Sequence, residues 1–245
     1  MGRIHLKKIG IICAVEKELQ PYLNVLEKKV TTTYARITFY EGTIDNIKVI
    51  TLFCGVCKVN AAIATQILVD KYNVDFIIVS GTAGGLDNRL EIGDTVISTE
   101  IAYHDVADGI LTEYHPWMPD IYFHADKNLI SLSENILKIS KLPQSVFFGR
   151  IVTGEAFIDQ KGRAEINEKF TPLCVDMETA AIAHVCYANS IPFIAVRSIS
   201  DTEEKSGENN FALNCDLASK NSFDVVKILL HQIFSLYTNE HNLIL

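Results

Sequence analysis

The chain has 245 residues, of which 48% are hydrophobic and 21% are charged, and its formal net charge at pH 7 is -8. This composition excludes an intrinsically disordered chain, and the excess of acidic residues argues against nucleic acid or an anionic membrane as the main partner. No apolar run reaches the ~20 residues of a membrane-spanning helix, and the N-terminus lacks the apolar segment of a signal peptide. We therefore expect one cytoplasmic α/β domain over residues 1–245, with reduced thiols.

Short apolar runs alternate with amphipathic stretches along the chain. The pattern predicts a strand at 8–14, a helix at 16–28, two β-rich stretches at 30–40 and 47–54 joined by a turn at Glu41-Gly42, and a helix at 58–72. There follow strands at 75–80 and 94–102, a helix at 127–140, strands at 146–152 and 173–176, a helix at 177–189, a strand at 193–200 and a helix at 216–237. This alternation predicts a largely parallel sheet covered by helices on both faces.

Acidic, glycine-rich and aromatic residues come directly after the predicted strands. Ligands of such sheets bind beyond the carboxyl ends of the strands, so these residues are the candidates for a binding site. They are Glu18, the run Gly81-Thr82-Ala83-Gly84-Gly85, Phe157, Glu178, Arg197 and Asp201. If the strands are parallel, three carboxylates and one aromatic ring gather at one edge of the sheet.

Each of these residues also has a structural interpretation when it is taken alone. Glu18 and Glu178 can be acids in the first turn of a helix, and Asp201 can be a helix cap. The GTAGG run does not match the dinucleotide pattern G-x-G-x-x-G and can be a tight turn. Arg197 is harder to explain in this way, because a buried arginine in an apolar run needs a partner.

Cys54 and Cys57 form a C-x-x-C motif. No second pair lies at metal-ligand spacing, and no thioredoxin-like context surrounds the motif. We interpret the two residues as incidental thiols at a strand-to-helix turn, and we expect no metal site.

Seven segments resemble the bacterial 5′-methylthioadenosine/S-adenosylhomocysteine nucleosidases, in the wider nucleoside phosphorylase family. They are KIGIICAVEKEL (8–19), CGVCKVNAA (54–62), SGTAGGL (80–86), IGDTVIS (92–98), TGEAFI (153–158), VDMETAAIAHVC (175–186) and VRSISD (196–201), in the family's order. The resemblance implies a three-layer α/β/α sandwich with a mixed central sheet and a homodimer. It also implies an activity without a metal or organic cofactor.

The resemblance implies hydrolysis of the N-glycosidic bond of an adenosine-derived nucleoside, as in methionine salvage, with water as co-substrate. Asp201 matches the general acid that protonates adenine N7, and Ser200 would support it. Glu18 matches the carboxylate that activates water. Glu178 matches the residue that holds the ribose hydroxyls, since a carboxylate accepts hydrogen bonds from vicinal O–H groups.

Five further residues match the family's substrate-binding positions. Arg197 and Thr82 would position the water and the carboxylates. Phe157 would stack on adenine, and the backbone of Ile158 would contact the edge of the base. Met177 would lie against the ribose.

The sequence departs from the family pattern in several places. Thr82 replaces a serine, Asp176 replaces a glutamate and Cys57 replaces a glycine, while the segment 103–124 as a whole differs. Because that segment contributes to the dimer interface and the 5′ pocket in the family, we expect Tyr114, His115 and Trp117 either to line the pocket or to pack against a partner. For His104 we expect a structural hydrogen bond.

Three alternative functions remain at this point. A phosphorylase needs a cationic or amide-rich phosphate site, whereas the loops here carry acids, so hydrolysis is favoured. A futalosine or aminofutalosine hydrolase differs in the 5′ group, which the altered 103–124 segment leaves open. A non-catalytic nucleoside-binding protein does not need three carboxylates at these positions.

Overall fold

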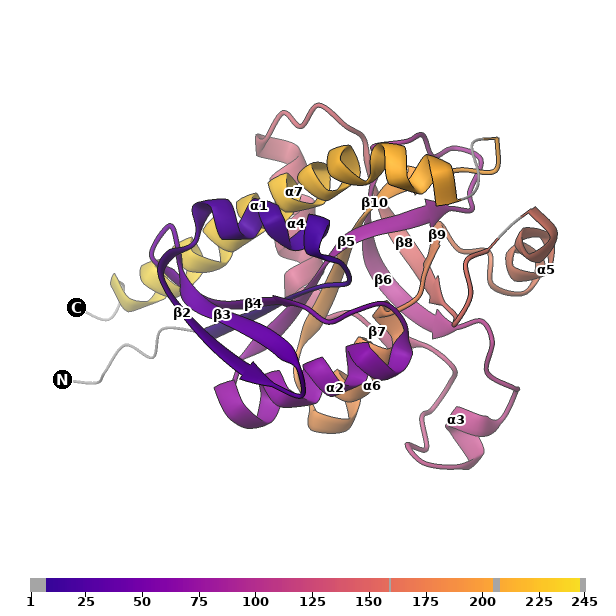
Figure 1. Cartoon of the computed structure of the whole chain (residues 1–245), viewed down its shortest axis with the longest axis horizontal. Helices are drawn as coiled ribbons and strands as arrows, with labels where there is room; N and C mark the ends of the chain where they lie inside the picture. The colour runs from indigo at the N-terminus through magenta and orange to yellow at the C-terminus, as the bar shows by residue number, and fades with distance from the viewer. Residues whose placement is uncertain (1–7, 159, 205–207, 243–245) are drawn as a thin grey trace.

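The computed structural model describes residues 8–158, 160–204 and 208–242, and a mixed β-sheet lies at its centre (Figure 1). The strands are β1 (Lys8–Cys13), β2 (Glu27–Tyr34), β3 (Ile37–Ile44), β4 (Ile47–Phe53), β5 (Phe76–Gly85), β6 (Thr95–Tyr103), β7 (Phe123–His124), β8 (Val146–Thr153), β9 (Cys174–Asp176) and β10 (Phe193–Asp201). The helices are α1 (Glu16–Val25), α2 (Lys58–Ile67) with a π-helical extension (Leu68–Tyr72), α3 (Ile110–Glu113), α4 (Lys127–Ile139), α5 (Gln160–Phe170), α6 (Thr179–Asn189) and α7 (Glu208–Asn242).

Helices cover both faces of the sheet. Figure 1 shows α1, α4 and α7 on one face and α2 and α6 on the other, which confirms the predicted three-layer α/β/α sandwich. The central strands β1 and β5 are apolar on both faces, and Ile9, Ile11, Ile77 and Ile78 are fully buried. Continuous apolar runs are typical of strands that are covered by helices on both faces.

The strands at the centre of the sheet form a closed circuit. Parallel pairs join β5 to β10, β6 to β8 and β8 to β9, and antiparallel pairs join β10 to β6 and β9 to β5. The sheet is therefore mixed, which confirms the mixed central sheet that the family resemblance implied; the prediction of a largely parallel sheet from the alternation alone was wrong. Closure places Gly84 of β5 opposite both Val175 of β9 and Asp201 of β10, so the ends of three strands meet.

The predicted turn at Glu41-Gly42 was also wrong. Both residues lie within β3, where they pair with Ile50 and Val49 of β4. A Cβ atom on Gly42 would collide with the backbone carbonyl of Glu27, so close packing rather than a turn explains this glycine.

Other element boundaries differ from the prediction. The first helix ends at Val25, β5 continues to Gly85, and α7 begins at Glu208 rather than at residue 216. The short elements α3 and β7 and the polar helix α5 were not predicted. Over the described ranges of the chain, none of the helices has the length and apolarity that a bilayer-spanning segment needs.

The hairpin β2–β3 yields a test of the observed turn. Tyr34 pairs with Ile37, so Ala35 and Arg36 form a two-residue turn with φ values of 47° and 65°. Such turns favour Asn-Gly, because both residues have positive φ. Replacing Ala35-Arg36 by Asn-Gly is expected to raise the free energy of unfolding by about 1 kcal/mol, measured by urea denaturation. Glu41→Asn, at a position within β3, is the control and should not stabilise the protein. If Glu41→Asn stabilised the protein and the Asn-Gly variant did not, the assignment of the turn to Ala35-Arg36 would be wrong.

Candidate active site

A cavity of about 700 Å³ opens where β1, β5, β9 and β10 end. Eight of the nine site residues expected from the sequence line this cavity: Glu18, Thr82, Phe157, Ile158, Met177, Glu178, Ser200 and Asp201. The ninth, Arg197, contacts Glu178 from within the protein. The structure thus brings together side chains that are far apart in the sequence.

Glu18, in the first turn of α1, is only 2% exposed and is held by four hydrogen bonds. Its Oε2 accepts from the backbone N–H groups of Ala14 at 2.7 Å and Val15 at 3.1 Å. Its Oε1 accepts from the backbone N–H of Thr82 at 2.7 Å and from the Thr82 hydroxyl at 2.8 Å. The carboxylate is therefore fixed between the end of β1 and the strand β5.

The GTAGG run is part of β5 and not a tight turn. A Cβ atom on Gly81 would lie 2.5 Å from Cδ of Glu18 and 2.7 Å from Nη1 of Arg197. Glycine is needed here because two charged side chains pack directly onto the strand. The same values show that Arg197 and Glu18 approach each other over Gly81.

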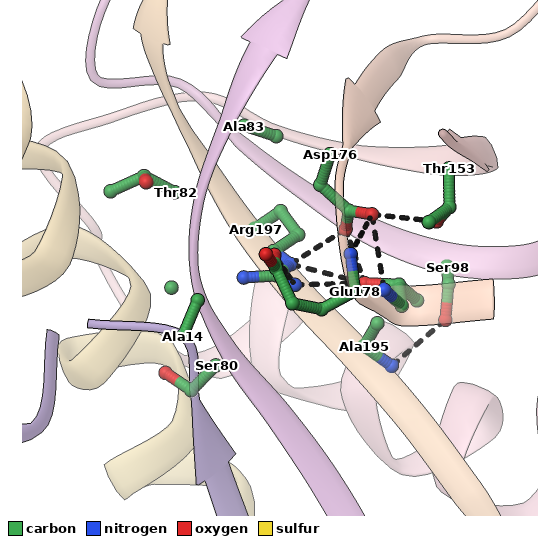
Figure 2. A network of polar contacts seen from close by, with 12 residues as sticks. Ala14, Ser80, Thr82, Ala83, Ser98, Thr153, Asp176, Glu178, Ala195 and Arg197 are labelled. Carbon is green, nitrogen blue, oxygen red and sulfur yellow. Dashed lines mark hydrogen bonds and ion pairs between the residues drawn. The ribbon is translucent and has the colours of Figure 1, made fainter. Parts of the chain in front are cut away.

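Arg197 is fully buried in β10 and organises the polar network shown in Figure 2. Its Nε lies 2.9 Å from Oδ2 of Asp176, and its Nη2 lies 3.4 Å from Oε2 of Glu178. Both nitrogens also donate to Oγ1 of Thr179, at 3.1 and 3.0 Å. Within the described part of the chain, its Nη1 is buried without a hydrogen-bond partner, so this N–H group is available to an acceptor.

Asp176 links Arg197 to the start of α6. Its Oδ1 accepts from the backbone N–H groups of Glu178 at 3.2 Å and Thr179 at 3.1 Å, and from the Thr153 hydroxyl at 2.6 Å. From the sequence, Asp176 was noted only as a departure from the family pattern, although the buried charge of Arg197 required an acidic partner. Through its hydrogen bond to the backbone N–H of Glu178, Asp176 holds the start of α6 in the position from which Glu178 lines the cavity.

Glu178 is the N-cap residue of α6 and is 4% exposed. Its Oε1 accepts from the backbone N–H of Cys57 at 2.9 Å. Burial raises the pKa of Glu178 to about 7; the positive charge of Arg197 opposes this rise and the negative charge of Asp176 adds to it. A carboxyl group with this pKa exchanges a proton near neutral pH.

Asp201 ends β10 and is 2% exposed. Its Oδ1 accepts from the Ser200 hydroxyl at 2.9 Å, and its Oδ2 lies 3.4 Å from Nη2 of Arg163 in α5. Burial raises the pKa of Asp201, against the lowering effects of Ser200 and Arg163. Arg163 was not among the predicted site residues, because α5 was not predicted.

A second polar network holds the segment 154–158, which carries Phe157 and Ile158. Lys58 Nζ lies 2.9 Å from Oδ1 of Asp105, and the backbone N–H groups of Lys58 and Glu155 donate to Glu155 and Asp105 respectively. This network ties the start of α2 to the loop after β8. Phe157 lines the cavity and remains 39% exposed, so its ring is accessible to a ligand.

The C-x-x-C motif lies at the turn from β4 to α2, as expected, and both thiols are free. Cys54 is buried, and burial raises its pKa. Cys57 occupies the family's glycine position with a φ of 82°, and its backbone N–H, rather than its thiol, holds Glu178. Among the residues described, no cluster of His, Cys, Asp and Glu side chains is arranged to hold a metal ion.

The segment 103–124 lies away from the cavity at the three residues singled out from the sequence. Tyr114, His115 and Trp117 do not line the cavity, and Tyr114 and Trp117 are 63% and 66% exposed. Of the two alternatives, lining of the pocket was wrong, and packing against a partner stays a prediction. His104 packs against Gly154, and its Nε2 is buried without a hydrogen-bond partner in the described ranges. The expected structural hydrogen bond of His104 therefore does not involve Nε2.

The first turns of α7 form a further wall of the cavity, which was not predicted from the sequence. Asn209, Phe211 and Ala212 line it from the first turns of α7. The prediction began this helix at residue 216, because the stretch before it is polar and lacks a clear apolar face.

Three comparisons with known proteins agree on the family. The family model described as the phosphorylase superfamily matches residues 8–231. A 5′-methylthioadenosine/S-adenosylhomocysteine nucleosidase of Exiguobacterium sp. is 41% identical over 225 residues, which cover 89% of this chain and 95% of that protein.

Two solved structures show the same fold. A 5′-methylthioadenosine/S-adenosylhomocysteine nucleosidase of Colwellia psychrerythraea 34H in complex with adenine has a TM-score of 0.85 at 32% identity, over 93% of this chain and 96% of the other. A futalosine hydrolase of Helicobacter pylori strain 26695 has a TM-score of 0.83 over 93% of this chain and 98% of the other. Its identity is 24%, so this second likeness extends to the fold alone.

The raised pKa of Glu178 predicts a pH-dependent stability. Between pH 4.5 and about 7 the folded protein retains a proton that the unfolded chain loses, so the free energy of unfolding falls as the pH rises through this window. The Glu178→Gln variant lacks this titration. The difference between its free energy of unfolding and that of the original protein should therefore shift in favour of the variant by roughly 1–3 kcal/mol between pH 4.5 and about pH 7. Urea denaturation across the window measures this difference. A variant that keeps the original pH dependence would show that Glu178 is not the titrating group.

Proposed function

The chain belongs to the phosphorylase superfamily, and we propose that it hydrolyses the N-glycosidic bond of 5′-methylthioadenosine and S-adenosylhomocysteine, with release of adenine and the 5-thioribose product. The observation that carries this proposal is that Glu18, Glu178 and Asp201 line one cavity of about 700 Å³. A cavity of this size accommodates a small organic ligand, and three separate carboxylates serve three separate parts of this reaction.

Asp201 is the general acid in this proposal. Cleavage leaves negative charge on the departing purine, and a proton delivered to N7 neutralises it. Burial raises the pKa of Asp201, which keeps a proton available at higher pH than on a free aspartate. The hydrogen bond from Ser200 to Oδ1 fixes the carboxyl group, and proton transfer of this kind typically contributes ~10²–10⁴-fold to the rate.

Glu18 positions and activates the water. Of its four donors, three are backbone N–H groups and only the Thr82 hydroxyl can rotate. Rotation of this hydroxyl towards the ligand frees an acceptor position on Glu18. A water bound there also accepts a hydrogen bond from Nη1 of Arg197, which approaches Glu18 over Gly81.

The remaining residues bind the nucleoside. Glu178 accepts hydrogen bonds from the ribose hydroxyls, and Met177 beside it contacts the sugar. The exposed ring of Phe157 stacks on adenine, and the backbone of Ile158 contacts the edge of the base. In this proposal the C1′–N9 bond lies between Glu18 and Asp201.

The charge of the cavity supports hydrolysis over phosphorolysis. Among the described residues that line the cavity, five are acidic and none is a Lys, Arg or His. The acidic residues are Glu18, Glu155, Asp176, Glu178 and Asp201. A phosphate dianion needs cations or a group of backbone amides, and neighbouring carboxylates repel it. Water is therefore the better nucleophile for this site.

We also propose that the protein is a homodimer that associates through the outer face of α2. Val59 and Ile63 in α2 are 69% and 42% exposed, and their spacing of four residues places them on one helix face. Val56, just before the helix, is 41% exposed. Exposed apolar patches of this kind mark interaction sites in soluble proteins. Since Val56 also lines the cavity, the second copy would lie close to the site.

Asp201→Asn separates catalysis from binding. The variant should bind methylthioadenosine with nearly unchanged affinity and lose about 10²–10⁴-fold in kcat, because the amide retains the shape but cannot protonate N7. Adenine release is followed with and without phosphate, with methylthioadenosine, adenosylhomocysteine and futalosine as substrates. Formation of a sugar 1-phosphate, or turnover of futalosine alone, would reject the proposed reaction, and equal turnover by the variant would reject the general acid.

Val59→Glu tests the dimer. A charge on the exposed face of α2 should convert a dimer into a monomer, as measured by sedimentation velocity. Leu213→Glu is the matched control, since Leu213 is 79% exposed on α7, which covers the opposite face of the sheet (Figure 1). A monomeric original protein, or dissociation by both substitutions, would contradict the proposed interface.

A further inference from the structure

Arg163 is a buried cation next to the proposed general acid. The residue is 3% exposed, and its Nη2 lies 3.4 Å from Oδ2 of Asp201. Its Nη1 donates to the backbone carbonyl of Gly85, at the end of β5. Its Nε is buried without a hydrogen-bond partner among the described residues. In the same part of the chain, Asp201 is the only ion-pair partner of Arg163.

The two oxygens of Asp201 have different partners. Oδ1 accepts from Ser200, whereas Oδ2 faces Arg163. Asp201 and Ser200 line the cavity but Arg163 does not, so Arg163 reaches the carboxyl group through the protein rather than through the space for the ligand. A buried arginine is costly unless its charge is compensated, and here the compensating charge is the group that must give up a proton.

We propose that Arg163 is a positioning residue for Asp201, which it orients and whose carboxylate it stabilises once the proton has moved to the purine. This inference rests on the proposed hydrolysis. In that step the Asp201 O–H bond breaks as the N7–H bond forms, and the C1′–N9 electron pair moves into the purine. The attacking water gives its hydroxyl group to C1′ and a proton to Glu18.

The charges around Asp201 make this role specific to Arg163. The charged residues that line the cavity from α1, the 154–158 segment, β9 and the start of α6 are all acidic: Glu18, Glu155, Asp176 and Glu178. Strand β5 faces Asp201 with Gly84, and α7 contributes the neutral Asn214, which donates to the Ser200 carbonyl at 3.0 Å. Burial raises the pKa of Asp201 while Arg163 lowers it, so Arg163 makes the buried acid a better proton donor.

Arg163→Met removes the charge and retains much of the side-chain volume. We expect kcat to fall about 10- to 100-fold with little change in the KM for methylthioadenosine, because the substrate does not touch Arg163. The alkaline limb of the pH profile of kcat/KM should move to higher pH, since the pKa of Asp201 rises without the neighbouring cation. Arg163→Lys should restore the original position of this limb and part of kcat.

Arg150→Met is the matched control. Arg150 also anchors α5, through the backbone carbonyl of Phe170, but it pairs with Glu100 at 2.7 Å and not with Asp201. A purely structural role of Arg163 would make both methionine variants behave alike, with no movement of the alkaline limb, and that result would overturn the inference. If Arg163→Met does not fold, Arg163→Gln and Arg163→Lys give the same comparison, and the limb must move only in the glutamine variant.

The two proposals fail in different ways. If the original protein releases no adenine from either nucleoside, the proposed function itself is wrong. If the original protein is active and the alkaline limb of Arg163→Met is unchanged, only the role of Arg163 is rejected.

Discussion

The burial of Arg197 is the constraint on which the site depends. A guanidinium group at the centre of a sheet must be paired, and removal of one partner of a buried ion pair typically costs about 3–5 kcal/mol. Arg197 therefore requires Asp176 at 2.9 Å, and Asp176 in turn accepts the first backbone N–H groups of α6. The same pair thus fixes β10, β9 and the helix that presents Glu178.

The close approach over Gly81 connects this network to the other side of the cavity. Only a residue without a side chain allows both Glu18 and Arg197 to pack against β5. The glycine is therefore explained by tertiary packing and not by a local turn. Because Gly81 lets the Glu18 carboxylate pack against β5, the next residue, Thr82, can donate to Glu18 with both its backbone N–H and its hydroxyl group.

The sequence predicted those features that depend on local patterns. An apolar run located the strand β10, which carries Arg197 and Asp201, and the position after each predicted strand identified the three carboxylates. The GTAGG run was misjudged because the side chains that exclude a Cβ come from distant segments. Arg163 could not be found in the same way, since its partner lies 38 residues away in sequence and its helix is polar without a clear apolar face.

The distribution of charge unites the two buried arginines. The described lining of the cavity carries carboxylates and no cation, whereas Arg197 and Arg163 each contact a lining carboxylate from inside the protein. A surface of this kind repels anions and favours positive charge in the cavity, such as the charge that develops on the sugar as a glycosidic bond breaks. The arginines compensate the buried acids without placing a cation against the sugar. A hydrolytic site for a nucleoside requires negative charge facing the sugar, and here the carboxylates that line the cavity supply it. The arginines, buried behind these carboxylates, balance their charge.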